Sequence, residues 1–219
     1  MPEIKMVNGQ LLPVGVTDRR LIRSLLAVER REFLPTSLKS ISHIDIDLKL
    51  KDGSAVSPAR YLMPAAPFGQ LVQAAQVTRN DAVLDIGCTT GYSSAVLSKL
   101  ANRVVGLECD PQLASSARAA LATLSISNAQ IVSGPLEDGW LKGAPYDVIF
   151  IGGSVPAIPQ SLVAQLSDYR GRLVAIIDDG QSMSAQLFVK SGSNFAGRKI
   201  FDAGGRPLPG FSRPDVFVF

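Results

Sequence analysis

The sequence predicts an α/β protein with a doubly wound, mostly parallel sheet. From residue 82 onward, apolar segments of strand length alternate with segments of helical periodicity, which is typical of βαβ units. Strand segments such as VIFI and LVAII are apolar throughout, as expected for strands buried on both faces. With 219 residues, 46% of them hydrophobic, we expect a single domain over 1–219. It divides into an N-terminal helical and loop extension at 1–80 and a core at 81–219.

The extension contains one helix pattern and one hairpin pattern. Residues 17–34 have apolar residues at helical spacing, which predicts an amphipathic helix with Thr17 as N-cap and Pro35 as its stop. Residues 40–58 alternate apolar and polar before the turn sequence KDGS, which indicates a short hairpin or loop. Residues 59–77 are expected to form a proline-containing loop that runs into a helix.

The core segments alternate regularly. Strands are expected at 82–87, 103–108, 129–134, 146–152 and 171–178, and helices at 92–101, 110–124 and 159–166. The tail, 185–219, has two or three short strand patterns separated by glycines. That pattern favours an antiparallel edge of the sheet over another helical unit.

Composition excludes several classes of function. The net charge of +3 is spread along the chain without runs of Lys or Arg, so we expect no nucleic-acid partner. No segment approaches the roughly 20 apolar residues of a membrane span, so we expect a soluble, cytoplasmic protein. Cys88 and Cys109 are too few to form a metal site, and we expect reduced thiols and no metal. His43 lies outside any catalytic pattern, which indicates a surface or packing role.

The turn after the first core strand, VLDIGCTTGY at 83–92, is the predicted ligand site. In open α/β sheets ligands bind at the carboxyl ends of the strands. The dinucleotide pattern G-x-G-x-x-G needs glycines at 87, 89 and 92, of which only Gly87 is present, so nicotinamide and flavin cofactors are disfavoured. The spacing acidic-x-G-x-G-x-G matches at Asp85, Gly87 and Gly91, with Thr89 at the remaining position.

That spacing resembles the S-adenosylmethionine loop of class I methyltransferases, which have a Rossmann-like fold. The resemblance implies that Asp85 serves the methionine ammonium. Glu108, 21 residues after Gly87, ends the next strand, where this geometry places an acid for both ribose hydroxyls. The expected cofactor side comprises Asp85, Gly87, Cys88, Thr89, Gly91, Glu108, Cys109 and Leu136, the last two packing about the adenine.

Thr89 is the departure within this loop. If its φ is positive, a β-branched residue costs roughly 1–2 kcal/mol, about 5- to 30-fold in affinity. If its φ is negative, its methyl group crowds the ligand or its hydroxyl contacts the ligand's carboxylate. The sequence leaves these cases open.

Further stretches resemble the protein-L-isoaspartate O-methyltransferase family. Residues 28–35, VERREFLP, are similar to V-P-R-E-x-F-V-P, with Glu29 in place of a proline. Residues 83–100 resemble V-L-E-I-G-x-G-S-G-Y-x-x-A-x-L-x-x-L, and residues 146–174 resemble Y-D-x-I, A-P-x-I-P and G-G-R-L-V in that order. The resemblance covers roughly 15–180. It implies an S-adenosylmethionine-dependent methyltransferase domain acting on a protein, peptide or small carboxylate.

The family signature G-Q-T-I-S-x-P is altered here. Its serine lies beside the isoaspartyl carboxylate, and aligning its proline with Pro64 puts Leu62 at the serine position. Methyl transfer to an ionised carboxylate needs alignment and no general base, so no catalytic acid or base is expected. Leucine removes a hydrogen bond, which implies altered or reduced isoaspartyl activity. The expected substrate side comprises Tyr61, Leu62, Met63, Pro64, Gly152, Gly153 and Ser154.

Other departures keep a second hypothesis open. Residues 134–139, GPLEDG, replace the family's G-D-G, so the aspartate for the adenine amino group is missing at Pro135. Glu137 or Asp138 supplies that acceptor instead, or the segment is an ordinary exposed turn. With Thr89 and Leu62, this leaves a non-catalytic S-adenosylmethionine-binding or regulatory protein as the alternative. Residues 152–154, GGS, lack the Asn/Asp-Pro-Pro-Tyr/Phe of nucleobase methyltransferases. The role of the C-terminal loop 204–211, GGRPLPGF, is left open.

Overall fold

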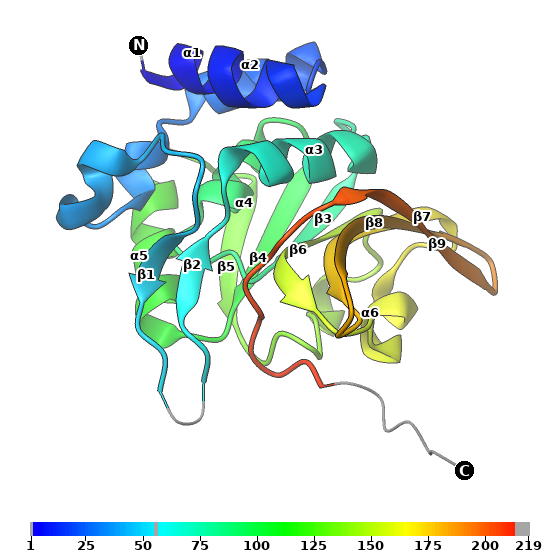
Figure 1. Ribbon diagram of the computed structural model, residues 1–219. Coiled ribbons are helices and arrows are strands. Elements are labelled where there is room, and N and C mark those ends of the chain that lie inside the picture. Colours follow the sequence, from blue (N-terminus) through cyan, green and yellow to red (C-terminus); the bar gives the residue numbers. More distant parts are fainter. Residues whose placement is uncertain (1, 55–56, 213–219) are drawn as a thin grey trace.

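A computed structural model describes residues 2–54 and 57–212, and its central feature is a seven-stranded sheet of order β5-β4-β3-β6-β7-β8-β9 (Figure 1). The strands are β3 Ala82–Ile86, β4 Arg103–Glu108, β5 Ala129–Ser133, β6 Val148–Val155, β7 Tyr169–Asp178, β8 Met183–Ser191 and β9 Asn194–Asp202. The five strands β3, β4, β5, β6 and β7 are parallel to one another, whereas β8 and β9 pair antiparallel at one edge. The predicted fold class, including its antiparallel C-terminal edge, is confirmed.

Helices cover both faces of this sheet. They are α3 Ala65–Ala75, α4 Tyr92–Ser98, α5 Pro111–Thr123 and α6 Gln160–Gln165, with a short 3-10 helix at Leu141–Gly143. Val83 of β3 belongs to the core cluster that includes side chains of α3, α4 and α5. Its neighbour Leu84 belongs to the opposite cluster, with Leu162 of α6. Successive strand residues point to opposite faces, so β3 is buried on both sides.

The N-terminal region is a series of short helices: α1 Pro2–Met6, a π-helical turn Val7–Leu11, 3-10 helices Leu12–Val14, Arg30–Phe33 and Thr36–Ile41, and α2 Arg19–Ala27. The predicted continuous helix over 17–34 is therefore wrong in extent. Asp18 is the N-cap in place of Thr17, and its side chain accepts from two backbone N–H groups of the first turn. The chain becomes extended at Val28. None of the helices within the described ranges is long and apolar enough to cross a membrane.

A hairpin forms as expected, but its second strand lies beyond the predicted 40–58, and this strand, β2, reaches the site. Strand β1 Leu48–Lys51 pairs antiparallel with β2 Arg60–Leu62. The expected loop at the start of 59–77 thus contains a strand, and α3 follows Pro64 as expected. This hairpin is separate from the main sheet.

After β9 the chain returns to the end of β6, as the red segment in Figure 1 shows. We call residues 204–210 the C-terminal strap. The Ser154 N–H donates to the Arg206 carbonyl at 2.8 Å, and the Leu208 N–H donates to the Ser154 carbonyl at 3.0 Å. The strap is thus fixed to the carboxyl end of β6.

Candidate functional site

The predicted site lies at the point where the strand order reverses. The chain passes from β3 outward to β4 and β5, then returns to β6 on the other side of β3, and such a switch point opens a crevice at the carboxyl ends. Gly87 follows β3 with φ +75°, and Gly91 caps α4 with φ +93°. A Cβ at Gly152 of β6 would lie 3.1 Å from the Gly87 carbonyl oxygen, so the two strand ends approach closely.

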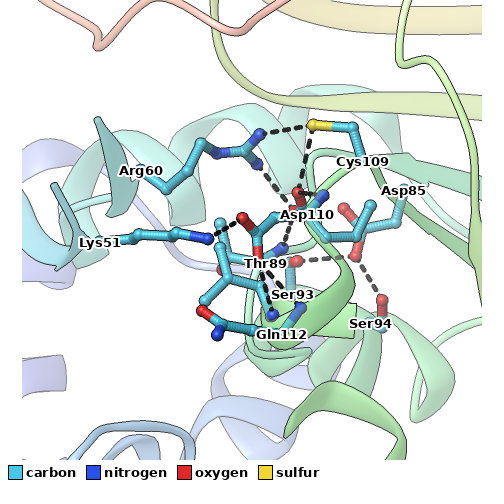
Figure 2. Close-up of polar contacts among 11 residues, drawn as sticks. Lys51, Arg60, Asp85, Thr89, Ser93, Ser94, Cys109, Asp110 and Gln112 are labelled. Atoms are coloured by element: carbon cyan, nitrogen blue, oxygen red, sulfur yellow. Dashed lines mark hydrogen bonds and ion pairs between the residues drawn. The ribbon is translucent and has the colours of Figure 1, made fainter. Parts of the chain in front are cut away.

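Asp85 is fully buried at the end of β3 and has one oxygen in need of a partner. Its Oδ2 accepts from the hydroxyls of Ser93 and Ser94, both at 2.6 Å (Figure 2). Its Oδ1 is buried without a hydrogen-bond partner among the described residues. Burial raises the pKa of Asp85 to about 6; the two hydroxyls oppose this rise, and the charge of Glu108 adds to it. An ammonium group would satisfy Oδ1 and favour the ionised carboxylate.

Glu108, at the end of β4, is fully buried, and donors already surround it. Its Oε2 accepts from the Thr89 N–H and from Arg60 Nη2, both at 2.8 Å. Its Oε1 accepts from the Asp110 N–H at 3.0 Å and from the Cys109 thiol at 3.5 Å. A carboxylate has about four acceptor positions, and these contacts use all of them. In this conformation Glu108 has no position left for a ribose hydroxyl.

Arg60 of β2 is the charged donor that occupies Glu108 and so closes this end of the site. Its side chain is 4% exposed, and besides Glu108 it donates from Nη1 to Cys109 Sγ at 3.4 Å. Figure 2 shows Arg60 and Lys51 of the hairpin directed toward Cys109 and Asp110, and Lys51 forms an ion pair with Asp110. A hollow of about 310 Å³ is lined by Arg60, Cys109 and Asp110. The hairpin thus places two cations against the end of β4.

The strap covers the glycine loop from the other side. A Cβ at Gly87 would lie 3.1 Å from Leu208 Cδ2 and 3.4 Å from Arg60 Nη2, so these side chains occupy the space above Gly87. The cavity that remains beside Gly87 and Thr89 measures about 20 Å³. Ligand pockets for small molecules are roughly 300–1,000 Å³. Asp85 thus suits the methionine end of S-adenosylmethionine, but the cavity beside Gly87 and Thr89 is too small in this conformation to hold it.

Of the seven predicted substrate-side residues, four line the same small cavity, whereas Pro64, Gly153 and Ser154 are not part of its lining. Its lining is Tyr61, Leu62, Met63, Phe68, Gly87, Thr89, Tyr92, Ser93, Phe150 and Gly152. Leu62 is buried at the position expected for the family's serine, so this wall is apolar. Gly153 lies under the strap, since a Cβ there would be 2.7 Å from the Arg206 carbonyl oxygen. The Ser154 hydroxyl donates to the Gly205 carbonyl at 3.3 Å.

Comparison with known proteins decides the family. The sequence profile described as Protein-L-isoaspartate(D-aspartate) O-methyltransferase (PCMT) matches residues 5–202. The chain belongs to the protein-L-isoaspartate O-methyltransferase family. It is 36% identical over 186 residues to Protein-L-isoaspartate O-methyltransferase 1 of Rhodopseudomonas palustris (strain HaA2), covering 85% of this chain and 72% of the relative.

Two further comparisons agree. Protein-L-isoaspartate O-methyltransferase of Protochlamydia amoebophila (strain UWE25) is 34% identical over 187 residues, covering 84% of each chain. A solved structure titled protein-L-isoaspartate O-methyltransferase superposes with a TM-score of 0.84 at 26% identity, covering 96% of this chain and 66% of that one. The resemblance predicted from the sequence is confirmed, and the family is one of S-adenosylmethionine-dependent methyltransferases.

Thr89, where the family pattern has a glycine, adopts the positive φ considered above and not the negative one. Its φ is +50°, in the left-handed region, and its buried N–H faces Glu108.

Cys88 is buried and Cys109 half-buried, and both are free thiols. His43 packs between Ser42 and Glu3. The described residues contain no cluster of His, Cys, Asp and Glu suited to a metal ion.

The segment that replaces the family's G-D-G is held against α6. Leu136 is buried in the core cluster that contains Leu162 of α6. The Glu137 carbonyl accepts from the Ser161 hydroxyl at 2.6 Å, and the Asp138 carbonyl accepts from Gln165 Nε2 at 2.7 Å. A Cβ at Gly210 would overlap the Glu137 carboxylate, so this side chain faces the strap.

Sequence reasoning missed two residues of the site, Arg60 and Leu208. With Pro64 aligned to the signature proline, Arg60 stands at the threonine of G-Q-T-I-S-x-P, so a cation in an apolar stretch was the available signal. Leu208 lies in a glycine- and proline-rich tail without periodicity, which gave no such signal.

A hollow of about 940 Å³ lies at the amino ends of the parallel strands, and its lining includes Asp81, Arg172 and Tyr169. Asp81 precedes β3 and is paired there with Arg172 at 2.8 Å. Because ligands in open α/β sheets bind at the carboxyl ends, we place the functional site at Gly87 and not in this hollow.

Proposed function

We propose that this chain is an S-adenosylmethionine-dependent O-methyltransferase with altered or reduced activity on isoaspartyl residues. The observation that carries the proposal is the apolar wall at Leu62, where the family signature has a serine. A buried hydroxyl there would bind a carboxylate oxygen, whereas leucine gives it no hydrogen bond. A site built to hydrogen-bond its substrate discriminates far more strongly than an apolar one.

The acceptor we propose is a carboxylate on a protein, a peptide or a small molecule. Carboxylates are ionised at neutral pH, so the protein has to align the oxygen and does not have to remove a proton. The cavity lining contains no histidine or lysine that would serve as a general base. Asp85, with its unpartnered Oδ1, supports recognition of the cofactor's ammonium group.

Transfer of labelled methyl groups from S-adenosylmethionine to an isoaspartyl peptide tests the proposal. We expect weak esterification by the parent protein and at least a tenfold gain in Leu62→Ser. Leu48→Ser is the matched control, because Leu48 pairs with Leu62 across the hairpin but does not line the cavity. Robust esterification of the isoaspartyl peptide by the parent protein would refute the altered specificity.

The alternative is a non-catalytic cofactor-binding or regulatory protein on the same scaffold. Glu108, whose acceptor positions are all used by protein donors, favours the regulatory form of this alternative, which needs no cofactor. Calorimetric titration with S-adenosylmethionine and S-adenosylhomocysteine separates the two, with Glu108→Ala as a control. Binding without turnover on a panel of carboxylate acceptors would support the alternative.

A further inference from the structure

We propose that Arg60 and Leu208 close the cofactor site of the free protein, and that S-adenosylmethionine binds only after Arg60 leaves Glu108 and the strap lifts from Gly87. The inference rests on the proposed function, because it assigns a gate to that cofactor site. Arg60 acts as the lock on the ribose-binding acid, and the strap acts as the cover over the glycine loop.

The lock follows from the charges at Glu108. The Arg60–Glu108 pair joins two buried side chains at 2.8 Å, exposed by 4% and 0%. Ribose hydroxyls are neutral donors, and hydrogen bonds from an ionised donor are roughly twice as strong. Exchanging the guanidinium for hydroxyls therefore leaves the buried Glu108 charge less compensated, which lowers the affinity for the cofactor.

The lock belongs to an element outside the main sheet. Arg60 belongs to the two-stranded β1–β2 hairpin, whose pairing is irregular between Lys49 and Lys51. No strand of the seven-stranded sheet pairs with this hairpin in the described residues. Withdrawal of Arg60 therefore leaves the hydrogen bonds of the main sheet intact.

The cover is tied to the same region as the lock. Arg206 of the strap donates from Nε to Asp47 at 2.9 Å, one residue before β1. Its guanidinium lies over the ring of Tyr61, with Cζ 4.8 Å from the ring centroid. Tyr61 is the direct neighbour of Arg60. Movement of the hairpin thus loosens two contacts of the strap, which couples the lock to the cover.

Calorimetric titration of the full chain with S-adenosylhomocysteine tests the gate. We expect Arg60→Gln to bind at least tenfold more tightly than the parent and Leu208→Ala to bind several-fold more tightly. Arg172→Gln is the matched control, because Arg172 forms a largely buried 2.8 Å pair with Asp81 at the amino ends of the parallel strands. Its affinity should stay within twofold of the parent.

A second measurement does not depend on the ligand. In a double-mutant cycle of Arg60→Gln and Glu108→Gln, the unfolding equilibrium constants should show a coupling of at least tenfold. A coupling below twofold would overturn the lock, even if Arg60→Gln alone proved too unstable to titrate.

The gate and the proposed function fail in different ways. If the parent binds S-adenosylhomocysteine and neither Arg60→Gln nor Leu208→Ala binds more tightly, the gate is wrong and the function stands. If no variant binds at millimolar ligand while the coupling is present, the proposed cofactor function is refuted, and with it the gate. In that case Arg60 stays paired with Glu108, and the site no longer binds the cofactor.

Discussion

The guanidinium of Arg30 lies over the ring of Tyr92, with Cζ 4.9 Å from the ring centroid. Arg30 is 1% exposed, and its Nη2 donates to the Met63 carbonyl at 2.6 Å. Burial lowers the pKa of this guanidinium, and the nearby Tyr92 opposes the shift. Since Tyr92 begins α4 after the glycine loop and Met63 lines the acceptor wall, one buried cation joins the N-terminal extension to both sides of the site.

Arg30→Ala should destabilise the protein by about 2–4 kcal/mol, because it leaves a cavity and an unpaired buried carbonyl. The neighbouring Arg31→Ala is the control: that side chain is 51% exposed, and its loss should change the free energy of unfolding by about 0.5 kcal/mol or less. Urea denaturation measures both. Equal effects of the two substitutions would contradict the bridging role of Arg30.

Asp85 should make stability depend on pH. Its folded pKa of about 6 lies above the ordinary value, so the ionised form is less stable in the fold than in the unfolded chain. The resulting loss of stability develops as pH rises from about 4 to about 6 and is complete above that, amounting to about 3 kcal/mol.

Asp85→Asn removes this titration. Relative to the parent, the variant should therefore gain up to about 3 kcal/mol of stability between pH 4 and pH 7. Urea denaturation of both proteins at each pH gives the difference. A constant difference across that range would show that the carboxyl of Asp85 titrates normally in the fold.

The succession of strands along the chain and the placement of Asp85 and Gly87 at the end of the first core strand were predictable because they depend on local pattern. Buried parallel strands are continuous apolar runs, and the glycine loop is contiguous in sequence. The extent of the helix over 17–34 was not predictable in the same way. The apolar spacing continues past Ala27, but the chain is extended at Val28. Arg30, two residues later, is buried and donates to the Met63 carbonyl, a distant contact that the spacing does not encode.

The closed state of the site could not be predicted from the sequence, because it depends on contacts between distant residues. Arg60 and Glu108 are 48 residues apart, and they meet only because the hairpin places β2 beside the end of β4. Leu208 is farther still, and it reaches Gly87 because the strap pairs with Ser154. Neither contact follows from periodicity, which describes how an element is buried and not which distant side chain fills a cleft.

Replacement by glycine should destabilise the protein less at Thr89 than at the neighbouring Thr90. Thr89 has φ +50°, which costs a β-branched residue roughly 1–2 kcal/mol that glycine avoids. Thr90 is similarly buried but does not have a positive φ. Thermal unfolding should therefore give Thr89→Gly a Tm about 2–8 °C above that of Thr90→Gly. Equal Tm values would mean that the loop relieves the strain at Thr89 in another way.

The two thiols should react slowly in the folded protein. Burial, and then the charge of Glu108, raises the pKa of Cys109 to about 11, and burial raises that of Cys88 well above its ordinary value. The thiolate is the nucleophile, and at pH 8 a pKa near 11 leaves about one thiolate per thousand thiols. Alkylation by iodoacetamide at pH 8 should therefore be about 100-fold slower in the folded chain than in urea. Mass spectrometry should find Cys109 modified before Cys88, because Cys88 is only 1% exposed. Loss of the early modification in Cys109→Ser would confirm the site, whereas failure of both cysteines to react in urea would indicate a disulfide instead of two free thiols.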